Sequence, residues 1–252
     1  MKVFDALTWL GHWPFAFLAQ RNAAGLARHL RAHGIDRALV SPLDAAFAPE
    51  PGPANRALSR AVRGVPSLEV APVINPAVAD WRDQLRDCLD RGPVRLVRVL
   101  PSYHRVVLTG PAMRSLMAEC RRRGVKVAIQ VRLIDERHEH HAVSLRPPKV
   151  PALARFLDAF PGEPVLLSGV LRTEAATLTA GRPQVRVDLA FVEWLETLRT
   201  ALAAVPARQV VFASHTPILE TAAAPAKFAR ARISPSAKRA LLGANLERFL
   251  NA

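Results

Sequence analysis

The sequence predicts an α/β protein, a (β/α)8 TIM barrel formed by a single domain over residues 1–252. Short apolar runs rich in β-branched residues alternate regularly with longer helical stretches, and eight such runs occur. A chain of 252 residues is long enough for an α/β barrel built as one unit. Half of the residues are hydrophobic (50%), which favours a sizeable core over disorder.

The eight predicted strands are mostly continuous apolar runs, which are typical of parallel strands buried on both faces. We expect strands at Val3–Leu7, Arg37–Ser41, Leu68–Ile74, Val94–Leu100, Val125–Val131, Pro164–Ser168, Val185–Leu189 and Gln209–Ala213.

Helical patterns lie between the predicted strands, and several end at a glycine, as at Gly34, Gly64 and Gly124. Glycine is the usual residue for the left-handed position that ends a helix. Strict alternation favours a barrel over an open doubly wound sheet. The dinucleotide-binding alternative would need GxGxxG after the first strand, and the sequence has none. We expect helices near 20–33, 54–63, 78–90, 111–123, 150–159, 172–180, 191–204 and 236–250, and a short segment at 216–223.

The formal net charge of +14 comes mainly from arginine, because only five of the 35 basic residues are lysines. The arginines are scattered. Three of them, at 121–123, precede Gly124, where cations complement the dipole at the end of a helix. A nucleic-acid surface needs basic residues clustered on one face, preferably with exposed aromatic residues. We therefore expect no nucleic-acid partner.

The chain has no signal-peptide pattern and no apolar run of about 18 residues. We therefore expect a cytoplasmic protein with no membrane partner. Cys88 and Cys120 lack the CxxC spacing, which argues against a disulfide scaffold or a cysteine zinc site.

Four segments together resemble one known family. The start reads Phe4-Asp5, then five residues, then Gly11-His12-Trp13-Pro14-Phe15, and Arg98-Val99-Leu100-Pro101 stands at the end of the fourth predicted strand. Near the end stand Phe212-Ala213-Ser214-His215-x-Pro217 and Leu242-x-x-Asn245-Leu246-x-x-Phe249-Leu250. With these segments the chain resembles the amidohydrolase-related branch of the metal-dependent hydrolase superfamily, whose members are TIM barrels.

The resemblance implies a divalent-metal site that this sequence does not reproduce. Family members use two histidines after strand one, one histidine after each of strands five and six, and an aspartate after strand eight; some add a modified lysine on strand four. The positions that match here hold Leu7, Trp9, Gln130, Ser168 and His215, and the lysine position is near Arg98. One histidine cannot hold a catalytic zinc, and arginine stays protonated. We therefore expect no metal at this site and no cofactor.

A rebuilt metal site remains an alternative. His138-Glu139-His140-His141 is dense in metal-binding residue types and follows Asp135 and Glu136. The segment lies in a predicted loop after strand five and lacks the helical spacing of HExxH, so it would need a further ligand from elsewhere. The other interpretation is a polar rim loop in which arginines pair with the acids.

Several polar side chains follow strands and are expected at the barrel mouth. Arg98 and Arg132 come from neighbouring strands, and two buried guanidiniums would need an anionic partner. That partner is either an internal acid, with Asp135, Glu136 and Asp44 as candidates, or the carboxylate or phosphate of a small ligand. The candidate ligand-binding residues are Arg98, Arg132, Gln130, Tyr103, Asp44 and Trp13.

The candidate catalytic residues are His215, His104 and Asp135, because histidine and carboxylate groups can move protons near neutral pH. No GxSxG elbow is present, which argues against serine catalysis. Trp9 either lines an apolar pocket or fills the space of the metal. We favour the second interpretation, because Trp9 occupies a ligand position directly.

Three functional hypotheses follow. The first is a metal-independent hydrolase of the lactone or amide type, or a binder of a small carboxylated ligand at the barrel mouth. The second is a non-catalytic pseudoenzyme that acts through protein–protein contacts, expected as a homo-oligomer. The third is a metal hydrolase with a site rebuilt from His215 and the His138–His141 loop.

Overall fold

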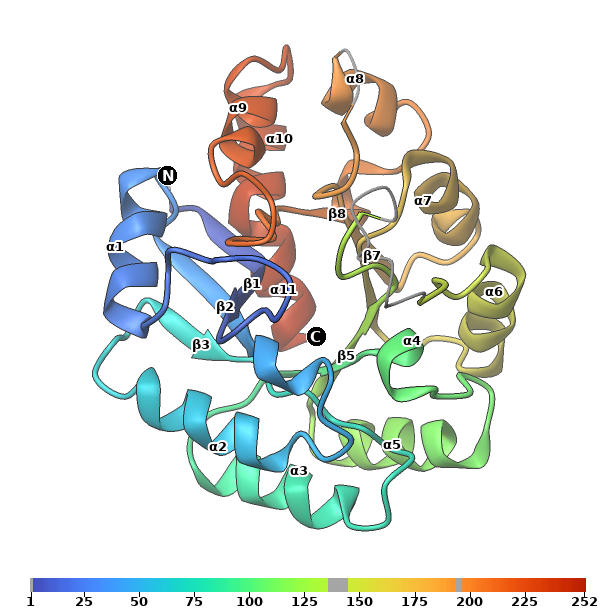
Figure 1. Cartoon of the computed structure of the whole chain (residues 1–252). Coiled ribbons are helices and arrows are strands. Elements are labelled where there is room, and N and C mark those ends of the chain that lie inside the picture. Colours follow the sequence, from blue (N-terminus) through green and yellow to red (C-terminus); the bar gives the residue numbers. More distant parts are fainter. Residues whose placement is uncertain (1, 136–144, 194–195) are drawn as a thin grey trace.

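The computed structural model describes residues 2–135, 145–193 and 196–252 and contains eight strands in these ranges (Figure 1). Each lies where the sequence predicts one, with ends that differ by a few residues. The strands are β1 (Phe4–Leu10), β2 (Arg37–Pro42), β3 (Leu68–Val70), β4 (Leu96–Val99), β5 (Lys126–Gln130), β6 (Val165–Ser168), β7 (Val185–Asp188) and β8 (Val210–Val211).

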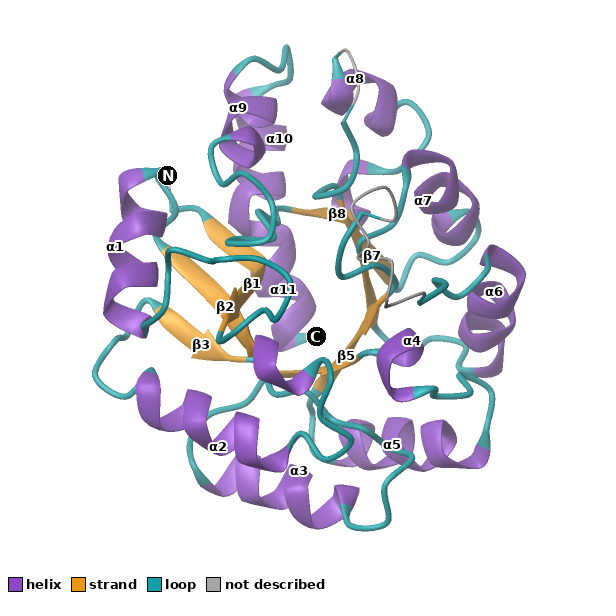
Figure 2. Cartoon of the chain, in the orientation of Figure 1, coloured by secondary structure: helices purple, strands orange, loops and turns teal. Residues whose placement is uncertain are grey.

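All strand pairs are parallel, and the strands follow chain order around the barrel. They form one sheet in the order β1-β2-β3 and a second in the order β4-β5-β6-β7-β8. Single bridges join the two sheets, between Val73 and Arg98 on one side and between Thr8 and Thr216 on the other. Figure 2 shows the strands inside a surrounding layer of helices. The fold is therefore the predicted TIM barrel.

The helices follow the strands as expected, with differences after β4, β7 and β8. A short helix at Pro101–His104 was not predicted, and of the described residues within the predicted helix at 191–204, Thr197–Leu202 are helical. The closing helical region contains one π-helical turn, η4 (Ala240–Ala244). The α-helices are α1 (Ala23–Ala32), α2 (Gly52–Ala61), α3 (Trp81–Asp90), α4 (Pro101–His104), α5 (Pro111–Arg122), α6 (Val150–Ala159), α7 (Arg172–Thr179), α8 (Thr197–Leu202), α9 (Ala223–Ala229), α10 (Pro235–Arg239) and α11 (Asn245–Asn251); η1 (Leu43–Ala45) and η3 (Ala207–Gln209) are 3-10 turns.

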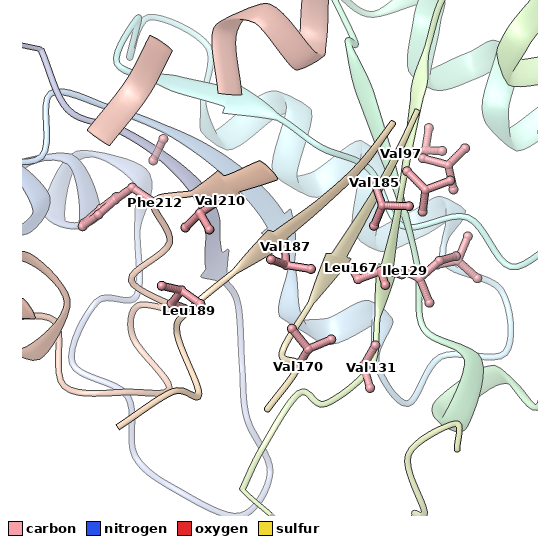
Figure 3. Close-up of a cluster of buried hydrophobic side chains, with 14 of the residues drawn as sticks. Val97, Ile129, Val131, Leu167, Val170, Val185, Val187, Leu189, Val210 and Phe212 are labelled. Carbon is pink, nitrogen blue, oxygen red and sulfur yellow. The ribbon is translucent and has the colours of Figure 1, made fainter. Parts of the chain in front are cut away.

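The core has two layers that follow the period of two along each strand. One layer packs the outer faces of the strands against the helices. Figure 3 shows part of it, with Val97, Ile129, Leu167 and Val187 coming from four successive strands. The second layer fills the barrel interior and contains Trp9.

The inward faces place polar residues in the middle of the barrel. On β4, Arg98 lies between the inward Leu96 and Leu100. On β5 and β6, Gln130 and Ser168 stand opposite each other in register. Arg98, Gln130 and Ser168 are therefore buried in the barrel interior and do not line a solvent-filled opening.

No helix in the ranges that the structure describes is long and apolar enough to cross a membrane.

Candidate functional site

Arg98 occupies the centre of the barrel and is fully buried. Its guanidinium donates to Ser41 Oγ at 3.1 Å, to Gln130 Oε1 at 3.0 Å, to Ser168 Oγ at 3.1 Å and to the carbonyl of Ala6 at 3.0 Å. Burial lowers its pKa to about 10, and buried acids oppose that shift. The group therefore remains a cation at neutral pH, with four of its five N–H donors bonded to the protein.

Trp9 and His215 pack beside this cation. The guanidinium carbon of Arg98 lies 5.5 Å from the Trp9 ring centroid, within range of a cation–π interaction. Trp9 Nε1 donates to Nδ1 of His215 at 3.3 Å, and the two rings meet edge to face. Trp9 is fully buried in the barrel interior.

The His215 ring is held at both nitrogens. Nε2 lies 2.5 Å from the carbonyl oxygen of Leu133, and Nδ1 accepts from Trp9. These two bonds fit a neutral ring that carries its proton on Nε2. Burial lowers the pKa of His215 to about 3. The ring is therefore a poor proton carrier near neutral pH.

Two buried carboxyl groups complete the centre. Asp5 accepts from the backbone amides of Leu7 and Ser214, and Asp188 accepts from those of Gly169 and Ala190. Burial raises the pKa of Asp5 to about 7 and also raises the pKa of Asp188. Arg98 lies close enough to oppose the shift at Asp188.

Sequence reasoning did not select either acid as a site residue. Asp188 ends β7, so the strand-end rule that selected other residues could have found it. Asp5 lies inside an apolar strand, and only its burial and backbone contacts reveal its position.

Arg132 does not join Arg98 around a shared opening. Its guanidinium forms a two-point ion pair with Glu174 at 2.6 and 2.7 Å and also donates to the carbonyl of Gly169. Gly169 has a φ of 76°, and a Cβ there would lie 2.4 Å from the Arg132 carbonyl oxygen. Glu174 was not among the acids that the sequence analysis considered as partners.

Gln130 connects these two arginines through its side-chain amide. Its Oε1 accepts from Arg98, and its Nε2 donates to the carbonyl of Arg132 at 2.5 Å. A cavity of about 20 Å³ lies nearby, lined in part by Tyr103, Arg132 and Leu133. This volume is suited to about one water molecule.

Tyr103 and Trp13 belong to an aromatic group above the barrel. Trp13 lies 5.3 Å from Phe47 between ring centroids, and Phe47 lies 5.3 Å from Tyr103. Phe15 also packs against Trp13 and Phe47. These separations are typical of structural aromatic packing.

Asp44 and His104 each have a backbone partner from another segment of the chain. Both carboxylate oxygens of Asp44 face the amide of His12, at 3.3 and 3.2 Å. His104 Nε2 lies 2.9 Å from the carbonyl oxygen of Ala45, while its buried Nδ1 has no hydrogen-bond partner among the described residues. Burial lowers the pKa of His104.

Asp135 ends the described segment before the gap at 136–144 and is partly buried. The His138–His141 segment of the third hypothesis lies outside the described residues. Within the described ranges, no group of three or more His, Cys, Asp or Glu side chains could hold a metal ion.

The residues at the positions of the family ligands do not fit a divalent cation. Trp9 and His215 are bonded to each other, and the His215 Nε2 proton is directed at a carbonyl. The Gln130 and Ser168 oxygens accept from the Arg98 cation, and Leu7 offers no side-chain donor atom. A divalent cation placed there would be repelled by the Arg98 guanidinium and would find the neighbouring donor atoms already hydrogen-bonded.

The comparisons with known proteins agree with this architecture. The amidohydrolase family model matches residues 12–252, and the chain belongs to that family. No curated protein matches the chain by sequence.

Solved structures share the fold at low sequence identity. An uncharacterised TIM-barrel protein of Bordetella bronchiseptica is 17% identical with a TM-score of 0.70. A 2,6-dihydroxybenzoate decarboxylase of Rhizobium is 14% identical with a TM-score of 0.73, and the 5-carboxyvanillate decarboxylase of Sphingomonas paucimobilis is 12% identical with a TM-score of 0.72. In each case the match covers 99% of this chain and 98% of the other. At these identities the likeness defines the fold and leaves activity to be argued from the site.

Proposed function

We propose that this amidohydrolase-family protein has a structural barrel centre in place of a metal site, and that it acts by binding rather than by metal-dependent hydrolysis. The supporting observation is the position of Arg98, whose guanidinium is bonded to four protein oxygens at that centre. A fixed cation there performs the organising role that a metal ion would otherwise have.

The contacts favour the non-catalytic hypothesis over a carboxylate site at the mouth. Arg98 and Arg132 would have to hold the ligand, yet one is enclosed by neutral oxygens and the other is paired with Glu174. His215 would have to move a proton, yet both of its ring nitrogens are engaged. A substrate would have to break these bonds before it met a reactive group.

Metal analysis of the purified chain tests the proposal. After incubation with zinc or manganese and removal of free metal, we expect substoichiometric metal and no change in thermal unfolding. A stoichiometric, stabilising metal would overturn the proposal. Loss of that metal on replacement of His138, His140 and His141 by asparagine would then identify the rebuilt site.

A second measurement separates structure from catalysis at Arg98. Arg98→Met leaves several buried oxygens without a donor, so we expect a loss of about 3–5 kcal/mol in the free energy of unfolding. Arg98→Lys keeps the charge with fewer donors and should lose less. If Arg98→Lys kept full stability and abolished a measurable hydrolysis or decarboxylation, the centre would be catalytic.

A further inference from the structure

A second polar site lies outside the barrel centre, in an open pocket of about 380 Å³ between the segment after α4 and the start of α6. Figure 1 shows α4 and α6 near each other on the β5 side of the barrel. The pocket combines three arginines with an apolar floor. The residues that matter are Arg105, Arg146 and Arg155 on the rim and Pro101, Val106 and Leu108 below them.

The three arginines form no ion pair and no side-chain hydrogen bond with any residue that the structure describes. This separates them from the arginines elsewhere on the surface that pair with neighbouring acids, such as Arg91 with Asp87 and Arg122 with Glu119. Three unpaired guanidiniums around one cavity give a local charge of about +3 at neutral pH. No side chain in the pocket lining is acidic.

Arg105 stands at a backbone position that favours glycine. It follows α4 with a φ of 52°, a conformation that costs a non-glycine residue about 1 kcal/mol. Arginine at this position therefore strains the backbone, whereas glycine would not. Such outliers are enriched at binding sites.

The floor of the pocket is apolar and rigid. Pro101, Val106 and Leu108 are buried, and Ser102 Oγ ties this segment to the carbonyl of Arg146 at 2.8 Å. Because that hydrogen bond joins the two sides of the pocket, the site is built before any ligand arrives. The volume suits a small molecule instead of a peptide.

We propose that this pocket binds a small organic phosphate monoester, with the phosphate held by Arg105, Arg146 and Arg155 and a compact apolar body against the floor. A phosphate monoester carries close to two negative charges near neutral pH. It also presents three oxygens that guanidiniums recognise in pairs. A single carboxylate would leave most of the positive charge unopposed. The inference is independent of the barrel centre and stands whether or not that centre is catalytic.

Calorimetric titration with phenyl phosphate tests the site. We expect the unmodified chain to bind phenyl phosphate. It should bind inorganic phosphate more weakly, because that ligand lacks the apolar body, and benzyl alcohol more weakly, because that ligand lacks the phosphate. Arg146→Gln and Arg155→Gln should each weaken binding by about tenfold, or about 1.4 kcal/mol. Arg28→Gln is the matched control, since Arg28 is exposed on α1 far from the pocket lining.

Arg146, Arg155 and Arg28 are all exposed. The thermal unfolding of each variant without ligand should therefore match that of the unmodified chain. Absence of phenyl phosphate binding would overturn the proposal. Equal weakening by Arg28→Gln would also overturn it, because the effect would then reflect net charge. Inorganic phosphate that binds as tightly as phenyl phosphate would overturn the ligand class.

Discussion

At the scale of single residues, Asp5 and His215 are ionisable side chains whose surroundings favour the neutral form of each. Burial raises the pKa of the Asp5 carboxyl and lowers that of the His215 imidazole. Their contributions to stability therefore change with pH in opposite directions. Arg98 remains the fixed cation between them.

Asp5→Asn removes a carboxyl whose folded pKa, about 7, lies above its ordinary value of 3.8. The folded state binds more protons between these values, so the Asp5 contribution is present at low pH and is lost as pH rises through 7. We expect the unfolding free energy of the unmodified chain relative to Asp5→Asn to fall between pH 4 and 7 by roughly 1 kcal/mol per pH unit. Urea unfolding across this range measures it. Asp90→Asn, at an exposed position, provides the control.

His215→Asn removes a ring whose folded pKa, about 3, lies below its ordinary value of 6.5. Here the unfolded state binds more protons, so the contribution is present above pH 6.5 and is lost as pH falls toward 3. Asparagine tolerates the positive φ of 60° at this position. We expect a loss of about 2–3 kcal/mol near pH 7, since two buried hydrogen bonds disappear.

The pH dependence gives this prediction a specific signature. The cost of His215→Asn should shrink as pH falls below about 6, whereas the cost of Asp5→Asn should grow over the same range. His12→Asn, at an exposed histidine, provides the control. A cost that did not change with pH would contradict the neutral buried ring.

At the scale of elements, the junction between β3 and β4 depends on a side chain from a helix. β3 has only three residues, and the chain beyond it meets β4 through one bridge, between Val73 and Arg98. Asn55 of α2 donates to the carbonyl of Val73 at 2.7 Å and accepts from its amide at 2.9 Å. The amide side chain thus substitutes for a missing strand partner.

Asn55→Ala should leave both backbone groups of Val73 without these partners in a buried place. We expect the free energy of unfolding to fall by about 2–4 kcal/mol. Ser59→Ala is the control on the same helix, because Ser59 Oγ only donates to the carbonyl of Asn55 and should cost less than about 1 kcal/mol. Equal effects of the two substitutions in urea unfolding would rule out the special role of Asn55.

Elements were predictable from sequence where burial sets a simple pattern. The eight strands of the described ranges are mostly apolar runs, and the period of two along β4 and β5 puts Arg98 and Gln130 on the inward face. The sequence predicts a helix over 191–204, whereas α8 in the described residues is Thr197–Leu202. The pairing of Arg132 with Glu174 joins residues 42 positions apart, and only the conformation of the intervening loops decides it.

At the scale of the whole molecule, exposed apolar groups gather at one end of the barrel while charge covers the surface. The large hydrophobic side chains that are exposed among the described residues all follow strands in sequence, in the segments after β1, β2, β4 and β6. They are Phe15, Phe17, Phe47, Val107 and Leu171. Exposed apolar groups gathered at one end are typical of a contact surface.

We expect copies of the chain to associate through this end, against the repulsion of a net charge of +14. Because salt screens such repulsion over about 10 Å or less, association should strengthen from low to moderate salt. Sedimentation velocity at several salt concentrations measures it. Phe17→Ser, at a side chain 76% exposed, should weaken association without affecting stability. A monomer at every salt concentration would rule out the homo-oligomer.

The central arginine also limits how this lineage can change. A histidine placed at position 7 or 9 would enter the shell of an existing guanidinium, so it would find a positive charge where it needed a metal to bind. Removal of Arg98 alone would leave Ser41, Gln130 and Ser168 facing an empty space. Each single substitution toward a metal-binding centre therefore lowers the stability of the fold. A metal-binding centre at this position would therefore need several substitutions at once.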